Sequence, residues 1–137
     1  MTQRPAQAPP TATKVVLVVD DDDDLRAAIV DVLRQEGFET IDARDGAQAI
    51  ERALQHRPDV LLLDYRMPNG TGTEVLKELR DKGLKSATIL MTAAENVGEV
   101  LLRLGFGHEE LLMKPFGLDL LVSLVDAAVP RARRNTP

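Results

Sequence analysis

The chain has 137 residues, 44% hydrophobic and 28% charged, with a formal net charge of −5 and no cysteine. This composition suits one globular domain with its own core, and the negative charge argues against nucleic acid as a direct partner. No apolar stretch reaches the roughly 18 residues of a membrane span, and the first 13 residues lack a signal-peptide pattern. We therefore expect a cytoplasmic protein with no membrane partner.

The N-terminal part of the chain contains its most informative feature. Residues 1–13 are rich in Pro, Ala, Thr and Gln, which predicts a disordered arm. The run from Lys14 to Val19 predicts a buried parallel strand, and five aspartates, Asp20 to Asp24, follow it directly. Crowded carboxylates raise one another's pKa values unless a cation neutralises them. A hard divalent ion with oxygen ligands fits better than zinc, because cysteine and paired histidines are lacking here.

Helical and strand patterns then alternate to the end of the chain. The expected helices run from Asp23 (as N-cap) to Gly37, from Asp45 (as cap) to Pro58, from Thr73 to Gly83, over 94–104, and from Gly117 to Val129. The later strands are expected at 38–42, 58–63, 87–91 and 111–113. This alternation predicts an α/β fold: a flavodoxin-like, doubly wound, five-stranded parallel sheet of order 2-1-3-4-5 with five helices. The domain would span residues 14–129, followed by a basic tail at 130–137.

The later strands also end at polar residues. Asp64, Thr92 and Lys114 each follow an apolar run. Open parallel sheets bind ligands outside the carboxyl ends of their strands. We therefore expect one crevice to contain Asp20, Asp21, Asp64, Thr92 and Lys114. Acids for a metal, a carboxylate nucleophile, a hydroxyl and an ammonium are the groups that phosphoryl transfer uses.

These motifs, in this order, resemble the receiver domains of two-component response regulators. The matching residues are Asp20-Asp21 with Leu25-Arg26, the segment Asp64…Met67-Pro68…Gly72, Thr92-Ala93, and Lys114-Pro115-Phe116. The resemblance extends from Lys14 to Val129. It implies Mg²⁺-dependent transfer of a phosphoryl group to Asp64 from a phosphohistidine on a sensor histidine kinase or a histidine phosphotransfer protein. It also implies a phosphoacceptor that assists its own phosphorylation and dephosphorylation, and not an enzyme.

The resemblance assigns two groups of site residues. The Mg²⁺ ligands would be Asp21 directly, Asp20 through a bound water, Asp64, and the backbone carbonyl of Arg66. The groups that contact the acyl phosphate would be Lys114, the hydroxyl of Thr92 and the backbone N–H of Ala93. A cis peptide bond between Lys114 and Pro115 is also implied.

Several other residues carry narrower expectations. Asp22 is expected to be a solvated bystander, His56 and His108 to be surface residues, Met67 to pack in a loop, and Met113 to lie in the core. Arg66 and Ala94 stand where the family tunes self-dephosphorylation, and they predict slow hydrolysis of the acyl phosphate. Leu111 replaces the family's usual aromatic residue three positions before the lysine. In the family, that aromatic side chain swings inward when the hydroxyl at the position of Thr92 moves toward the phosphate. With leucine there, we expect output through displacement of a helix and not through an aromatic side chain.

The last helix has a broader apolar surface than packing on a sheet requires. The extra stripe consists of Leu120, Leu124 and Ala127, which indicates either core packing or a contact with a partner. The resemblance implies output through the face of the fourth helix, fifth strand and last helix, toward an unknown downstream protein or a homodimer. Only seven residues follow Pro130, so we expect no DNA-binding output domain in this chain.

Two other functions remain open at this point. A receiver-like module could bind a partner without phosphorylation, although the intact set of site residues argues against it. An aspartate-nucleophile phosphatase needs an Asp-x-Asp-x-Thr or Asp-x-Asp-x-Val motif, and the position four residues after Asp20 holds Asp24. The sequence does not identify the kinase, the signal or the target, and it fits both a stand-alone regulator and a fragment of a larger protein.

Overall fold

The computed structural model describes residues 14–68, 70–93, 99, 102–103, 105 and 110–134. Its centre is a five-stranded parallel sheet of order β2-β1-β3-β6-β7. The strands are β1 (Val15–Val19), β2 (Glu39–Ala43), β3 (Val60–Asp64), β6 (Ala87–Thr92) and β7 (Glu110–Met113). Numbered along the chain, these strands have the predicted order 2-1-3-4-5, so the fold prediction is confirmed.

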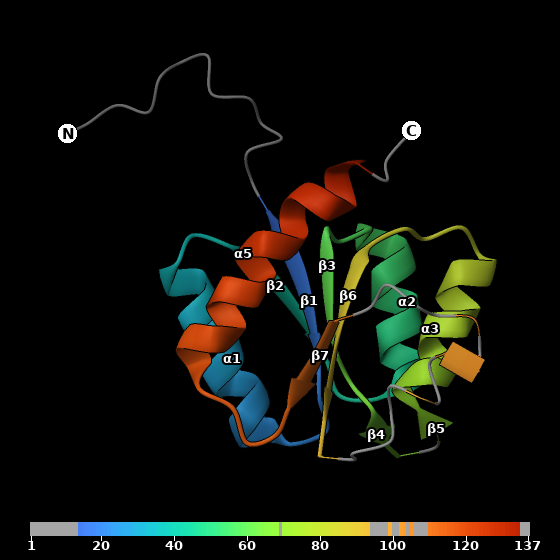
Figure 1. The fold of residues 1–137 in the computed structure, drawn as a ribbon, viewed down its shortest axis with the longest axis horizontal. Helices are drawn as coiled ribbons and strands as arrows, with labels where there is room; N and C mark the ends of the chain where they lie inside the picture. Colours follow the sequence, from blue (N-terminus) through green and yellow to red (C-terminus); the bar gives the residue numbers. More distant parts are fainter. Residues whose placement is uncertain are drawn as a thin grey trace.

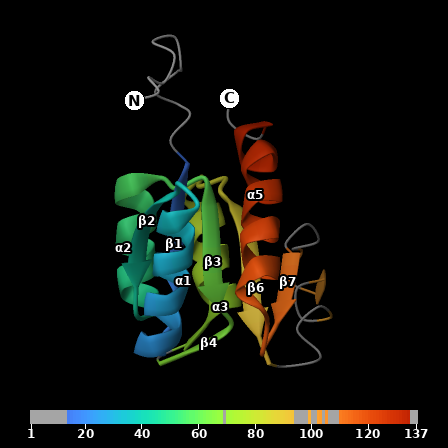
Figure 2. The same ribbon diagram turned by 90° about the vertical axis from the view of Figure 1, so that its left-hand side faces the viewer.

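Helices cover both faces of this sheet (Figures 1 and 2). One layer contains α1 (Asp23–Gln35) and α5 (Leu118–Arg134), and the other contains α2 (Gly46–His56) and α3 (Gly72–Asp81). Two short strands, β4 (Arg66–Met67) and β5 (Gly70–Thr71), pair as an antiparallel hairpin between β3 and α3. The described residues form four of the five expected helices. The expected arm at 1–13 and most of the expected helix at 94–104 lie outside the described residues.

The apolar strands are explained by the two helical layers. Successive strand residues point to opposite faces of a sheet. Val16 and Val18 of β1 therefore pack with α1 and α5, while Leu17 and Val19 pack with α2 and α3. A strand covered on both faces needs apolar residues at every position, which is why β1 reads as a continuous hydrophobic run until it reaches the aspartates.

The start of α1 differs from the sequence-based expectation. Its N-cap is Asp22, whose side chain accepts hydrogen bonds from the backbone N–H groups of Asp24 and Leu25. Asp23, the expected cap, is the first helical residue. Asp22 is exposed, as expected of a solvated residue, but it caps α1 and is therefore not a bystander. Five identical side chains contain no signal for the cap position, which depends on where the chain turns away from β1.

The caps of the next two helices give a mixed result. Asp45 caps α2, as predicted, by accepting a hydrogen bond from the backbone N–H of Gln48. Helix α3 begins at Gly72 and is capped by Thr71, whereas Thr73 was expected to cap or start it; Glu74 completes a capping box. In that box the threonine and glutamate side chains each accept a hydrogen bond from the other residue's backbone N–H.

Two further expectations near the C-terminus were wrong. Helix α5 continues through Pro130 to Arg134, whereas Val129 was expected to end it. Met113, expected in the core, has 44% of its surface exposed, while the preceding Leu112 has 2%. Strand β7 lies at the edge of the sheet, and its alternate side chains face different environments. Within the described part of the chain, no helix combines the length and the apolar character needed to cross a membrane.

Candidate functional site

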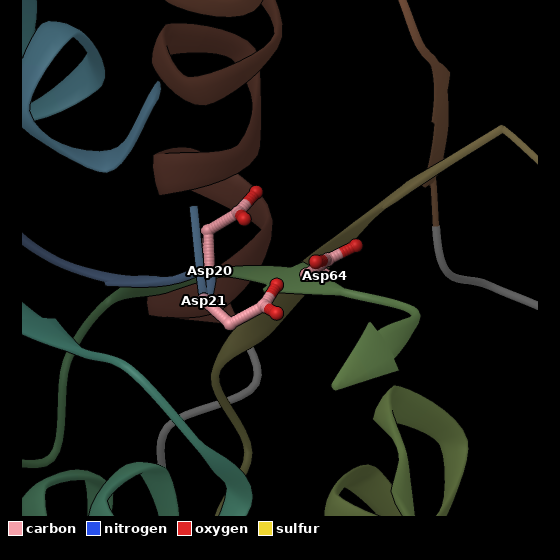
Figure 3. A group of neighbouring side chains, drawn as sticks. All are labelled: Asp20, Asp21 and Asp64. Carbon is pink, nitrogen blue, oxygen red and sulfur yellow. The ribbon is translucent and has the colours of Figure 1, made fainter. Parts of the chain in front are cut away.

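Three aspartates meet at the carboxyl ends of β1 and β3 (Figure 3). The register pairs Val19 with Leu63, so the residues that follow these two, Asp20 and Asp64, lie side by side. Each of Asp20, Asp21 and Asp64 offers a carboxylate oxygen within 4.8 Å of the others. Asp20 and Asp64 are buried, and Asp21 is exposed. This is the convergence that the strand ends predicted.

Lys114, the residue that follows β7, joins this cluster. Its Nζ donates to Oδ2 of Asp20 at 3.0 Å and to Oδ1 of Asp64 at 3.3 Å. Its backbone N–H donates to the carbonyl of Thr92 at 2.8 Å, which links the ends of β6 and β7. Thr92 is buried at the end of β6, and Ala93 follows it at an exposed position. The peptide bond between Lys114 and Pro115 is cis, as the resemblance implied.

The electrostatics of the cluster favour an additional cation. Burial and, after it, the charge of Asp20 raise the pKa of Asp64 from 3.8 to about 7, although Lys114 opposes the rise. Burial would lower the pKa of Lys114, but its hydrogen bond to Asp20 and the charge of Asp64 raise it overall. With all three carboxylates ionised, one ammonium cannot neutralise them. Three oxygen donors around a partly exposed position suit Mg²⁺, which takes few protein ligands and keeps several waters.

Arg66 and Leu111 lie next to this centre. Arg66 belongs to the β4–β5 hairpin directly after β3, where it pairs with Thr71. Its side chain is exposed, and its guanidinium lies 5.7 Å from the ring centre of Tyr65. Leu111 is partly buried against the core on the α2 and α3 side. Ala94, the other residue expected to tune hydrolysis, lies outside the described residues, as does His108.

Gly72 and Arg26 have local roles that sequence reasoning missed. A Cβ atom at Gly72 would lie 2.6 Å from the carbonyl oxygen of Asp64, so α3 can start this close to the site only because residue 72 has no side chain. Arg26 donates from Nη1 to the carbonyl of Asp20 at 2.7 Å. Both residues belong to the motifs that resemble receiver domains, but their contacts depend on distances between elements that are far apart in the sequence.

Comparison with known proteins identifies the family. Residues 16–126 match the family model of the response regulator receiver domain. The chain belongs to this family. The receiver domain is 40% identical over 126 residues to the DNA-binding response regulator MtrA of Mycobacterium tuberculosis (strain H37Rv). The aligned region covers 91% of this chain and 53% of MtrA. It thus spans about half the length of MtrA, and the DNA-binding description applies to that longer protein.

Solved structures agree with this assignment. The receiver domain of a Francisella response regulator has a TM-score of 0.78 and 29% identity, covering 87% of this chain and 98% of that one. The response regulator TrrA of Thermotoga maritima, solved in complex with Mg²⁺ and BeF, has a TM-score of 0.75 and 31% identity over 85% of this chain and 99% of TrrA. The receiver domain described here therefore fits a phosphoacceptor role in two-component signalling.

Proposed function

We propose that this receiver domain accepts a phosphoryl group on Asp64 from a phosphohistidine, carried by a sensor histidine kinase or a histidine phosphotransfer protein. The observation that carries the proposal is the position of Asp64. Its buried carboxylate lies 3.3 Å from the ammonium of Lys114 and within reach of two further carboxylates. A weak nucleophile in this setting gains reactivity from positioning and from charge neutralisation.

The chemistry divides among named residues. A carboxylate oxygen of Asp64 attacks the phosphorus, the phosphorus–nitrogen bond to the donor imidazole breaks, and its electron pair stays on that nitrogen, which takes up a proton. Lys114, the Thr92 hydroxyl and the backbone N–H of Ala93 would stabilise the charge on the phosphoryl oxygens. A Mg²⁺ ion held by Asp20, Asp21, Asp64 and the carbonyl of Arg66 would supply the remaining positive charge.

A recess beside the site supports docking of the donor. It has a volume of about 400 Å³ and opens next to Lys114, with an almost entirely apolar lining of Leu25, Ala93, Pro115 and Phe116 around it. A partner that presents a phosphohistidine must bring it to Asp64 along a surface that excludes water from the reacting atoms. Apolar residues around a polar centre suit such a contact.

The output surface is proposed on the side of β7 and α5. Met113 of β7 and Leu120 of α5 are exposed, the latter by 51%. Ala127 is exposed, whereas Leu124 packs partly against the core of α1 and α5. The stripe on α5 therefore divides into a packed residue and two exposed ones. A downstream protein or a second copy would contact the exposed part, and the charge gained at Asp64 would shift this face.

Labelling with a small phosphodonor tests the proposal. Acetyl phosphate with Mg²⁺ should add one phosphoryl group to the wild type, measured by intact mass, and a chelator should prevent the addition. Asp64→Asn should abolish it. The matched control is Asp59→Asn, which changes an aspartate just before the same strand, and this variant should be labelled normally.

The opposite results would separate the other functions. Persistent labelling of Asp64→Asn would refute Asp64 as the acceptor. Absence of label on the wild type would favour a phosphorylation-independent binding module. Continuous release of phosphate without accumulation of label would instead indicate a phosphatase.

A further inference from the structure

The guanidinium of Arg26 ties together three elements at the acidic end of the sheet. Besides its contact with the Asp20 carbonyl, Nε donates to Oδ2 of Asp42 at 2.9 Å, and Nη2 donates to Oδ1 of Asp23 at 2.7 Å. The side chain of Arg26 is 14% exposed. The ends of β1 and β2 and the start of α1 are therefore joined through one planar group, whose fixed fork suits several acceptors at once.

Asp20 is held at every polar position. Its backbone N–H donates to the carbonyl of Ala43 at 3.2 Å. Its Oδ1 accepts from the N–H of Asp22 at 2.9 Å, and its Oδ2 accepts from Lys114. The fourth position, the carbonyl oxygen, accepts from Arg26. Arg26 thus completes the anchoring of this buried residue.

The anchored carbonyl also determines where Asp21 points. This carbonyl belongs to the planar peptide unit that joins Asp20 to Asp21. Fixing the plane restricts the two dihedral angles beside it, and those angles set the direction in which the Cα–Cβ bond of Asp21 leaves the main chain. Asp21 is exposed, so the orientation of its carboxylate toward Asp64 depends on the main chain more than on packing.

Asp42, the β2 residue that accepts from Arg26, is itself held in place. Asp42 lies on β2 opposite Val18 of β1. The carbonyl of Asp42 accepts a hydrogen bond from Nη1 of Arg52 on α2. Arg26 therefore fastens the Asp20–Asp21 peptide to a residue held by both the sheet and the other helical layer.

We propose that Arg26 is a positioning residue for the metal site, which it serves by holding the Asp20–Asp21 peptide so that Asp21 faces Asp64. The effect is geometric, because the carboxylates of Asp23 and Asp42 already balance the guanidinium charge. This inference rests on the proposed function, since it concerns Mg²⁺ affinity. Partners that orient metal ligands typically change affinity by about 10- to 100-fold when removed.

A matched arginine on the same helix makes the test specific. Arg34 also connects α1 to β2, donating from Nε to Oγ1 of Thr40 at 2.6 Å, but it does so near the start of β2, away from the acids. Isothermal titration with Mg²⁺ should show affinity weakened by about tenfold in Arg26→Gln and in Arg26→Lys. Arg34→Gln should retain the wild-type affinity for Mg²⁺, even if its thermal stability falls as far as that of Arg26→Gln.

A second measurement separates positioning from chemistry. At saturating Mg²⁺ the labelling rate of Arg26→Gln with acetyl phosphate should return close to the wild-type rate, because the variant retains all the groups proposed to react. If Arg26→Gln does not fold, Asp42→Ala serves as the second variant, since it removes the side-chain acceptor that holds the guanidinium to β2. It should weaken Mg²⁺ binding in the same direction by a smaller factor.

Three results would overturn the inference or what it rests on. Wild-type Mg²⁺ affinity in Arg26→Gln would exclude a positioning role. Wild-type affinity in Arg26→Lys alone would assign the effect to charge and not to the geometry of the guanidinium. Failure of the wild type to bind Mg²⁺ would refute the proposed function itself. If the wild type binds Mg²⁺ and the Arg26 variants bind it equally well, only this inference is refuted.

Discussion

The two ends of the central sheet use the same residue types for opposite purposes. At the amino end, Nη1 of Arg80 donates to the carbonyls of Leu84 and Ser86 at 3.0 and 3.1 Å, before β6 begins. Oδ2 of Asp59 accepts from the backbone N–H of Val15 at 2.9 Å. These charges satisfy backbone groups that strand pairing leaves over. At the carboxyl end, three carboxylates are held against one another.

Charged residues thus satisfy backbone groups at one end of the sheet and are crowded against one another at the other end. A charge that satisfies a backbone dipole contributes to stability without requiring any other molecule. Like charges held together cost stability until a cation or a proton arrives. Substitutions at the amino end should therefore lower stability and leave metal binding alone, whereas substitutions of the clustered carboxylates should weaken metal binding without lowering stability.

The largest expected effect is on metal binding at the carboxyl end. Asp21→Asn should weaken Mg²⁺ binding by at least about 100-fold, because it removes the proposed direct ligand and not an outer contact. Its stability without Mg²⁺ should equal or exceed that of the wild type, since one repelling charge is lost. Isothermal titration and thermal unfolding measure the two quantities. Asp24→Asn makes the same change in net charge nearby and should leave the affinity unaltered; equal losses in both variants would contradict a ligand role.

At the amino end we expect a loss of stability alone. Arg80→Met preserves the aliphatic stem but leaves the carbonyls of Leu84 and Ser86 without their guanidinium donor. The free energy of unfolding should fall by about 1–3 kcal/mol, measured by urea denaturation. The Mg²⁺ affinity should remain that of the wild type. A weakened affinity in this variant would show that the two ends of the sheet are coupled.

The smallest expected effect is a pH dependence of the free energy of unfolding in Mg²⁺-free buffer. The pKa of Asp64 is raised to about 7 in the folded protein, so the folded state keeps its proton where the unfolded chain has lost it. This group therefore lowers stability progressively as pH rises from about 4 to 7, and the cost is complete above pH 7. Asp64→Asn should stabilise the protein by about 1–2 kcal/mol more at pH 8 than at pH 5. If urea denaturation showed the same gain in stability for Asp64→Asn at both pH values, the raised pKa of Asp64 could not be its cause.

The broad features of the site were predictable because they depend on local patterns. Apolar runs that stop at Asp20, Asp64 and Lys114 mark strand ends, and a parallel sheet brings its carboxyl ends to one edge. The contacts of Arg26 were not predictable in this way. They require the register that places Asp42 opposite Val18, and lateral register between strands has no local signature in a chain covered on both faces.

The errors at Met113 and Pro130 have separate physical causes. A three-residue apolar run before Lys114 looks the same whether a strand is central or at an edge, so the exposure of Met113 could not be read from it. Proline removes one backbone hydrogen bond from a helix and clashes with the preceding turn. That penalty does not by itself end a helix, and α5 passes through Pro130 to Arg134.

Gly72 limits how this site could be transplanted to another protein. A designer who copied the aspartates, Thr92 and Lys114 onto a different open sheet would reproduce every side chain that carries charge or a hydroxyl. Any residue other than glycine at the start of the following helix would still place a Cβ atom 2.6 Å from the carbonyl oxygen of Asp64. The helix would have to move outward and take the β4–β5 hairpin with it. The minimal portable unit therefore includes a position with no side chain.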